Sequence, residues 1–135
     1  LKSDGACPGP LERRVGELLG AYDGPVAVQS FDPRSMEWFA ANVPELPRGQ
    51  LSMRYTQGEM PQLGAARRFI LTNLLALNLS KPDFIAYEVS ALGDIAPRLA
   101  RFLGLALLAW TVRSRTQWEG ARCLADNLIF EGFAA

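Results

Sequence analysis

The sequence predicts an α/β fold with a parallel sheet, and two observations support this fold class. Short apolar runs alternate with helical patterns along the 135 residues, which is typical of parallel strands joined by crossover helices. One of these runs, at 105–109, is continuously apolar, as in a strand buried on both faces of a parallel sheet. No linker interrupts the pattern, so we expect one compact portion over residues 1–135 with a core of its own.

Five segments predict strands. The first is rich in β-branched residues and lies between Gly24-Pro25 and Asp32-Pro33, pairs that are typical of chain turns. The second is the weakest of the five. The predicted strands are 25–31, 48–53, 83–89, 105–112 and 126–132.

Five further segments predict helices, because apolar residues recur on one face of each. Asp32 and Pro33 suit the N-cap and the first position of the second helix. The third segment is apolar almost all round, so we expect it to be well buried. The last helix is expected to begin with a capping box, Thr116 and Glu119. The helical segments are 11–22, 33–43, 64–78, 92–104 and one that starts at Thr116.

The apolar stripes predict which helix faces pack on the sheet. We expect Trp38 and Trp118, which lie on such stripes, to pack between helix and sheet. Gly104 suits the C-terminal stop of the fourth helix. The stripe of that helix consists of Leu92, Ile95, Leu99, Phe102 and Leu103.

The composition argues against several classes of function. Fourteen basic residues balance fourteen acidic ones, so no positive field favours nucleic acid or an anionic membrane. The longest apolar stretch is broken by Thr and Asn and is shorter than the ~18 residues of a membrane span. Cys7 and Cys123 lie far apart, which favours reduced thiols in a cytoplasmic protein over a disulfide or a metal site. The start of the chain shows no signal peptide.

Polar and aromatic side chains follow several of the predicted strands. Ser30 and Phe31 end the first, Glu88 ends the third, and Trp110 and Thr111 end the fourth. Ligands of parallel α/β folds gather at the carboxyl ends of the strands. The set therefore suits a small polar ligand with an apolar part.

Three segments resemble, in their order and spacing, the later part of the glycerophosphodiester phosphodiesterase family. The family has a strand ending in Ser-Phe and a later strand ending in Trp-Thr-Val-Asn, which Ser30-Phe31 and Trp110-Thr111-Val112 match. Arg113 stands where the family has Asn. The three segments are VAVQSFDP, LLAWTVRS and CLADNLIFEGF.

The closing strand and the start of the chain also resemble this family. Asp126 fits the first acidic position of the closing strand, whereas Phe130 and Glu131 replace its Thr and its second acid. Lys2 fits the lysine of a Glu-x-Lys motif, whose glutamate we expect just before residue 1.

The resemblance implies a metal-dependent hydrolase of lipid metabolism with a (β/α)8 TIM barrel. Such enzymes cleave glycerophosphodiesters to glycerol 3-phosphate and an alcohol, with a divalent cation (Mg²⁺ or Ca²⁺) and two histidines from the first strands. This chain has no histidine, and a complete barrel needs about 250 residues. We therefore expect a fragment, a C-terminal portion with about five of eight strands, that holds no catalytic residue and no cation and is inactive by itself.

Four residues are predicted to bind the substrate. Lys2 would offset the phosphate charge, Ser30 would donate a hydrogen bond, and Phe31 and Trp110 would form an apolar wall against the glycerol carbons. Three of them have an ordinary structural alternative: a solvated terminal lysine at Lys2, helix-start chemistry at Ser30 and core packing at Trp110. Glu88 would either line the same site or pair with an arginine.

Two classes of function and two classes of partner stay open. The chain is part of a glycerophosphodiester-cleaving enzyme, or it is a non-catalytic α/β module that binds a small phosphorylated or polyol ligand or a protein. Five strands taken from a closed ring leave two open sheet edges. We expect these edges to pair with the missing N-terminal barrel half or with a second copy of the chain, forming a homodimer.

Overall fold

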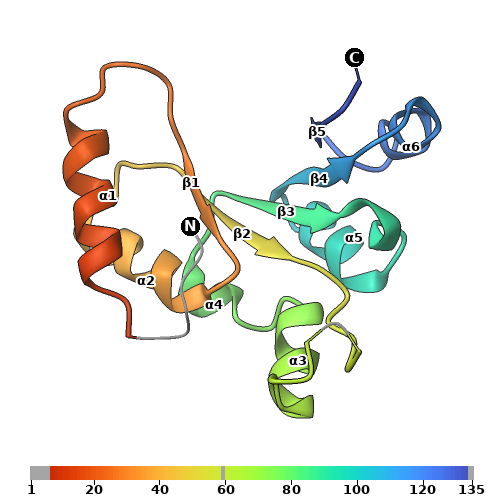
Figure 1. Cartoon of the computed structure of the whole chain (residues 1–135), viewed down its shortest axis with the longest axis horizontal. Coiled ribbons are helices and arrows are strands. Elements are labelled where there is room, and N and C mark those ends of the chain that lie inside the picture. The colour runs from red at the N-terminus through yellow and green to blue at the C-terminus, as the bar shows by residue number, and fades with distance from the viewer. Residues whose placement is uncertain (1–6, 59, 134–135) are drawn as a thin grey trace. The chain divides into compact units, whose positions relative to one another are not determined.

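The computed structural model describes residues 7–58 and 60–133 and divides the chain into two compact units (Figure 1). The first unit comprises residues up to Leu51 together with Ala76–Asp83. The second comprises Ser52–Leu75 and the chain from Phe84 onward. The predicted Lys2 site lies outside the described residues.

The first unit packs helices on a parallel strand pair. It contains α1 (Pro10–Gly20), β1 (Val28–Ser30), α2 (Pro33–Asn42), most of β2 (Arg48–Ser52) and α4 (Leu77–Ser80). Strand β1 runs parallel to β2, with Val28 opposite Arg48 and Ser30 opposite Gln50. The core of this unit consists of Val28, Met36, Phe39 and Leu46, with Val15, Leu19, Val26, Trp38 and Val43 packed around it.

The second unit is a three-stranded parallel arrangement in chain order. Its elements are α3 (Ala65–Thr72), β3 (Phe84–Glu88), the short 3-10 helix η1 (Val89–Ala91), α5 (Ile95–Phe102), β4 (Ala106–Val112), α6 (Arg115–Ala121) and β5 (Asn127–Phe130). Strand β4 pairs with β3 on one side and with β5 on the other, both in parallel.

The predicted fold class is confirmed, because five strands pair in parallel with helices between them. All five predicted strands form, with ends trimmed by up to three residues. Asp32 caps α2, as predicted, because its side chain accepts a hydrogen bond from the Arg34 N–H. Gly104 follows α5 with φ +94°, a left-handed conformation that glycine adopts without steric cost.

The prediction of one buried helix over 64–78 is wrong. The segment forms two helices, α3 and α4, which belong to different units. Helix α3 ends at Asn73, and Leu74 then takes a left-handed conformation with φ 56°, which stops the helix. Phe69, with 63% of its surface exposed, shows that the helix is not buried all round.

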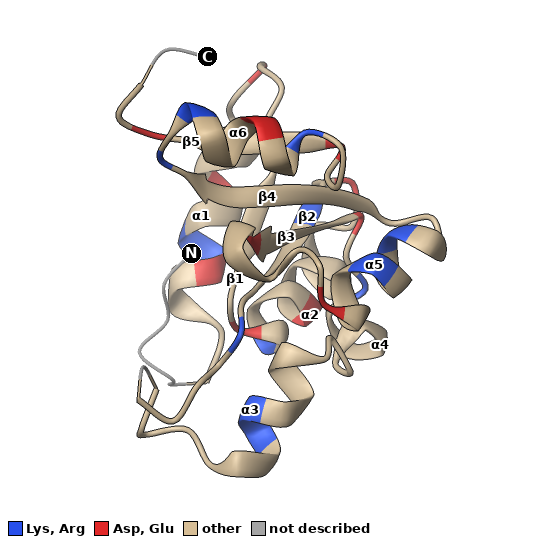
Figure 2. Cartoon of the chain, turned by 90° about the vertical axis from the view of Figure 1, so that its right-hand side faces the viewer, with Lys and Arg blue, Asp and Glu red and all other residues tan. Residues whose placement is uncertain are grey.

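The predicted packing stripe of the fourth helix is confirmed at Leu92, which is buried, and is wrong at its other four residues. Ile95 and Phe102 are 82% and 86% exposed, while Pro97 and Ala100 supply the buried face of α5. The small side chains let the helix approach the sheet, and the bulky ones then point to solvent. Figure 2 shows that the charged residues of α5 and α3 are all basic.

The N-cap of the last helix lies two residues earlier than predicted. Ser114, and not Thr116, is the N-cap of α6, because its hydroxyl accepts a hydrogen bond from the Gln117 N–H. The Gln117 side chain in turn accepts from the Arg113 N–H at 2.7 Å. Ser114 and Gln117 thus supply the capping interactions that we predicted for Thr116 and Glu119.

Two further features of the described chain bear on function. Cys7 and Cys123 are free and exposed. Within residues 7–58 and 60–133, no helix has both the length and the apolar character that crossing a bilayer requires.

Candidate functional site

The orientation of Tyr87 defines the two faces of the sheet in the second unit. Its hydroxyl donates to the carbonyl oxygen of Thr72 in α3 at 2.8 Å, so Tyr87 points to the side that this helix covers. Successive side chains of a strand point to opposite faces, which places Glu88 on the other face. Glu88 lies directly opposite Trp110 in the β3–β4 register, and opposed residues share a face.

Glu88 and Trp110 therefore form a pair at the carboxyl ends of β3 and β4, on the sheet face opposite Tyr87. Both side chains are half-buried. The indole N–H of Trp110 donates to the Ala86 carbonyl oxygen at 2.9 Å, which fixes the ring over the neighbouring strand. We call these two residues the strand-end pair.

The end of β4 departs from simple strand alternation. The β4–β5 register shifts between Ala109 and Val112, so Trp110 and Thr111 occupy an irregular segment, and the peptide bond between them is cis. Because of this register shift, simple strand alternation does not fix the face that the Thr111 side chain takes.

Two exposed ion pairs lie at the strand ends of the second unit. Arg54, after β2, binds Asp94 through two contacts of 2.6 and 3.1 Å, and the Asp94 carboxylate raises the pKa of Arg54. Arg113, after β4, binds Glu131, after β5, at 2.6 Å. The Glu88 side chain, in contrast, makes no hydrogen bond or ion pair with any residue that the structure describes.

The Tyr87 hydroxyl does not ionise at neutral pH. Burial, together with the nearby carboxylates of Asp94 and Glu88, raises its pKa to about 12 against the opposing effect of Arg54. Its hydroxyl stays protonated and donates to Thr72 and, at 3.4 Å, to the Met53 carbonyl oxygen. The residue therefore anchors the sheet and does not transfer protons.

The strand end of the first unit is built differently. Ser30 is 1% exposed, and its hydroxyl accepts from the Asp32 N–H at 3.1 Å. Asp32 accepts from the Arg34 backbone N–H and binds the Arg34 guanidinium at 2.7 Å. The Gln50 side-chain amide donates to the carbonyl oxygens of Ser30, Phe31 and Leu51.

A buried carboxylate joins the two helices of the first unit. Glu12 of α1 is 2% exposed and accepts from the Ser35 hydroxyl of α2 at 2.6 Å and from the Gly9 N–H at 2.8 Å. Burial raises the pKa of Glu12 and so does Asp32, but the hydrogen bonds outweigh them and the net pKa is lowered. The group thus stabilises the α1–α2 packing in its ionised form.

The predicted binding residues fall into separate units. Ser30 and the half-buried Phe31 belong to the first unit, Trp110 belongs to the second, and Lys2 lies outside the described residues. Their joint role in a substrate site stays a prediction. Sequence reasoning left Glu88 out of the binding set, although its place at a strand end was a signal; only the register shows that it opposes Trp110.

The described residues do not fit a metal centre. Among residues 7–58 and 60–133, no three side chains of His, Cys, Asp or Glu come together in a group that could hold a metal ion. A divalent cation needs several oxygen ligands at once. The cation that the family resemblance implies would therefore need ligands beyond the described residues.

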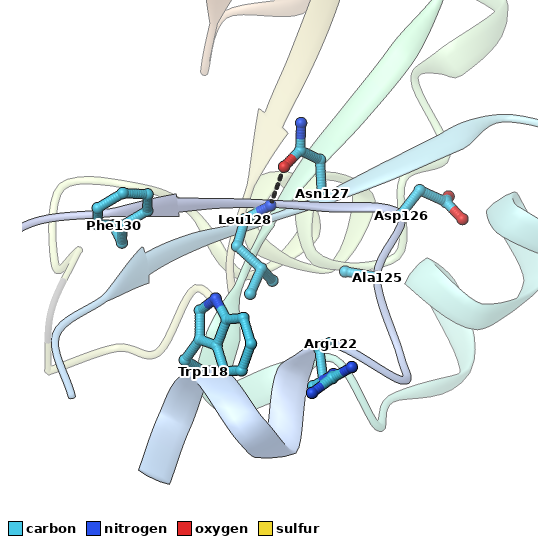
Figure 3. Close-up of a pocket in the computed structure, with 7 residues that line it drawn as sticks. All are labelled: Trp118, Arg122, Ala125, Asp126, Asn127, Leu128 and Phe130. Atoms are coloured by element: carbon cyan, nitrogen blue, oxygen red, sulfur yellow. Dashed lines mark hydrogen bonds between the residues drawn. The ribbon is translucent and has the colours of Figure 1, made fainter. Parts of the chain in front are cut away.

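A pocket of about 270 Å³ lies between α6 and β5, and neither residue of the strand-end pair lines it (Figure 3). The guanidinium groups of Arg115 and Arg122 lie 4.6 and 5.0 Å from the ring centre of Trp118, a cation–π arrangement. The Asn127 side chain accepts from the Leu128 N–H. The pocket is lined by Trp118, Arg122, Ala125, Asp126, Asn127, Leu128 and Phe130.

The chain is similar in fold to a crystal structure from Silicibacter pomeroyi DSS-3. That protein, provisionally named a glycerophosphoryl diester phosphodiesterase, matches with a TM-score of 0.58 and 21% sequence identity. The match covers 77% of this chain and 33% of that chain. No protein-family model and no curated protein matches. At this identity the likeness shows the fold, and the α/β arrangement is consistent with the predicted partial TIM barrel.

Proposed function

We propose that this chain is the later part of a metal-dependent hydrolase that cleaves glycerophosphodiesters to glycerol 3-phosphate and an alcohol. The observation that carries the proposal is the fold likeness to the Silicibacter pomeroyi protein, whose provisional name is glycerophosphoryl diester phosphodiesterase. The strand-end residues Ser30, Phe31 and Trp110 support it, because they match the family pattern at the ends of the corresponding strands.

In this proposal the chain binds substrate and does not perform the proton transfers. Trp110 offers an apolar surface to the glycerol carbons, Phe31 offers another, Ser30 hydrogen-bonds the substrate and Lys2 offsets the phosphate charge. Proton transfer near neutral pH is the usual task of histidine, and the sequence has none. The Mg²⁺ or Ca²⁺ ion and its ligands belong to the complete enzyme.

The proposal also names a partner. Strand β5 pairs with β4 alone among the described strands of its unit, so its other edge is open to a further strand. The missing N-terminal barrel half would supply that strand, and a second copy of the chain is the alternative.

The first experiment measures binding and turnover on the chain as it stands. We expect no turnover of glycerophosphocholine with Mg²⁺ or Ca²⁺, and we expect saturable binding of glycerol 3-phosphate in an NMR titration. Trp110→Leu should weaken that binding, and Trp118→Leu, which removes an indole on α6, should leave it unchanged. Turnover above background, or glycerol 3-phosphate binding that Trp110→Leu leaves unchanged, would contradict the proposal.

A second candidate is a non-catalytic module that binds a small phosphorylated or polyol ligand or a protein, and the complete lack of histidine favours it. The sequence of the gene upstream of Leu1 distinguishes the two. A His-Arg-Gly segment, a later His-Asp pair and a glutamate in Glu-x-Lys spacing with Lys2 would decide for the enzyme.

A further inference from the structure

Helix α5 exposes an apolar stripe on one face, while its opposite face packs on β3 and β4. The members of the stripe are spaced so that they lie on the same side of the helix, and each has more than half of its surface exposed. Contiguous apolar side chains on a surface typically mark a site that binds a membrane or a protein. We call this set the α5 stripe; it consists of Ile95, Leu99, Phe102 and Leu103.

The charged residues of α5 are both arginines (Figure 2). Arg98 is exposed, lies beside the α5 stripe on the helix surface, and makes no hydrogen bond or ion pair with any residue that the structure describes. Arg101 binds Asp126 at 2.8 Å, and the N-cap residue Asp94 binds Arg54 at 2.6 Å. These two ion pairs neutralise their carboxylates, so the Arg98 guanidinium leaves a positive charge next to the apolar side chains.

Strand pairing at the open sheet edge does not cover the α5 stripe. Helix α5 packs on β3 and β4, and β4 already has a strand on each side. A strand added beyond β5 borders neither of the strands on which α5 packs. The partner strand that we propose above therefore leaves the stripe exposed.

A second copy of the chain fits the α5 stripe poorly. A symmetric contact sets the same surface of each copy against itself, so it would bring the two Arg98 guanidinium groups together and make them repel each other. A stable protein interface also takes about 20–30 residues from each partner. Helix α5 has 8 residues and is about 12 Å long, so the stripe supplies only a small part of such an interface.

We infer that α5 docks on an anionic lipid surface, with the α5 stripe among the upper acyl chains and Arg98 at the headgroups. A helix with an apolar face and arginine beside it lies in the membrane interface, with that face buried about 5–10 Å deep. The apolar contact supplies most of the affinity, and an arginine near an anionic surface adds about fivefold. Because the whole chain has no net charge, the attraction acts at short range. The inference does not depend on the proposed hydrolase activity.

The test measures binding of the chain to lipid vesicles by flotation. One set of vesicles contains equal parts of phosphatidylglycerol and phosphatidylcholine, and the control set contains phosphatidylcholine alone. The chain should bind the anionic vesicles at least about fivefold more tightly than the neutral ones, and this binding should weaken as salt is added. Absence of binding to the anionic vesicles, or equal binding to both sets, would overturn the inference.

Two matched pairs of variants assign the binding to α5. Phe102→Ser removes a large apolar side chain from the α5 stripe and should weaken binding to the anionic vesicles by about tenfold, whereas Leu18→Ser, at an exposed position of α1, should leave it unchanged. Arg98→Gln should weaken it by about fivefold, and Arg13→Gln, at an exposed position of α1, should not. Equal effects within either pair would show that the chain binds the vesicles through another surface.

Two further measurements separate this inference from its alternatives. All four substituted side chains are exposed, so circular dichroism should show each variant folded as the wild type is. Light scattering reports the oligomeric state. A dimer that Phe102→Ser converts to a monomer, with no vesicle binding, would assign the α5 stripe to a second copy and overturn the inference. Vesicle binding without glycerol 3-phosphate binding supports the inference and counts against the proposed function alone.

Discussion

The strand ends of the two units use polar residues for different purposes. In the first unit, Ser30, Asp32 and Gln50 bond to the backbone next to them and thereby start α2 and fix the end of β1. In the second unit, Glu88 has no such bond, and Trp110 fixes its own ring on Ala86. The polar side chains at the strand end of the first unit thus bond to neighbouring backbone, whereas the Glu88 side chain of the second unit does not.

The largest loss of stability that we expect from removing a structural polar residue of the first unit is at Glu12. Glu12→Ala removes a buried acceptor and leaves the Ser35 hydroxyl and the Gly9 N–H without it, so the free energy of unfolding should fall by about 2 kcal/mol. Urea unfolding measures the loss. The control is Glu17→Ala on the same helix, where the exposed pair with Arg14 should contribute less than about 0.5 kcal/mol. Equal losses of unfolding free energy in the two variants would show that the Glu12 side chain does not have this structural role.

A somewhat smaller effect is expected at the start of α2. Asp32→Ala deletes the N-cap and the partner of the Arg34 guanidinium, and should cost about 1.5 kcal/mol in unfolding free energy. Asp32→Asn keeps a capping oxygen and should recover most of that loss. If Asn and Ala are equally destabilising, capping is not what Asp32 supplies.

In the second unit the matching structural residue is Tyr87, on the face opposite the strand-end pair. Tyr87→Phe leaves the Thr72 carbonyl oxygen without its donor and should cost about 1 kcal/mol, whereas the exposed Tyr22→Phe should cost close to nothing.

The same residue also predicts an alkaline limit. The folded pKa of Tyr87 is about 12 against an ordinary value of 10, so folding favours its protonated form. Its contribution is complete below pH 10 and is lost as the pH rises toward 12. An alkaline stability profile of Tyr87→Phe that matches the wild type would contradict this assignment.

The acid side of the pH profile should show a smaller effect. The folded pKa of Glu12 lies below its ordinary value of 4.5, so its ionised form stabilises the fold. That contribution is present above pH 4.5 and is lost as the pH falls through the folded pKa. As the pH is lowered from 6 to 3, the free energy of unfolding should therefore fall less steeply in Glu12→Gln than in the wild type. Parallel curves would show that Glu12 does not titrate with folding.

Much of the fold follows from local sequence, and the site does not. Strand positions, the Asp32 cap and the stop at Gly104 depend on neighbours within a few residues, and all were predicted correctly. The break after α3 depends on Leu74 taking a left-handed conformation, which no residue type there indicates.

The misjudged stripe of α5 has a similar origin. Apolar periodicity identifies a helix face, but Pro97 and Ala100 pack instead because small residues allow close approach to the sheet. Glu88 was recognisable as a strand-end residue, yet its opposition to Trp110 requires the β3–β4 register. That register is set by packing between distant segments.

The most direct test of the contrast between the two units is the change in unfolding free energy that glycerol 3-phosphate produces. A ligand that binds only the folded state stabilises it in proportion to its affinity. We predict that saturating glycerol 3-phosphate stabilises the wild type and adds little to the stability of Trp110→Leu. A Trp110→Leu chain that glycerol 3-phosphate stabilises as much as the wild type would contradict the account.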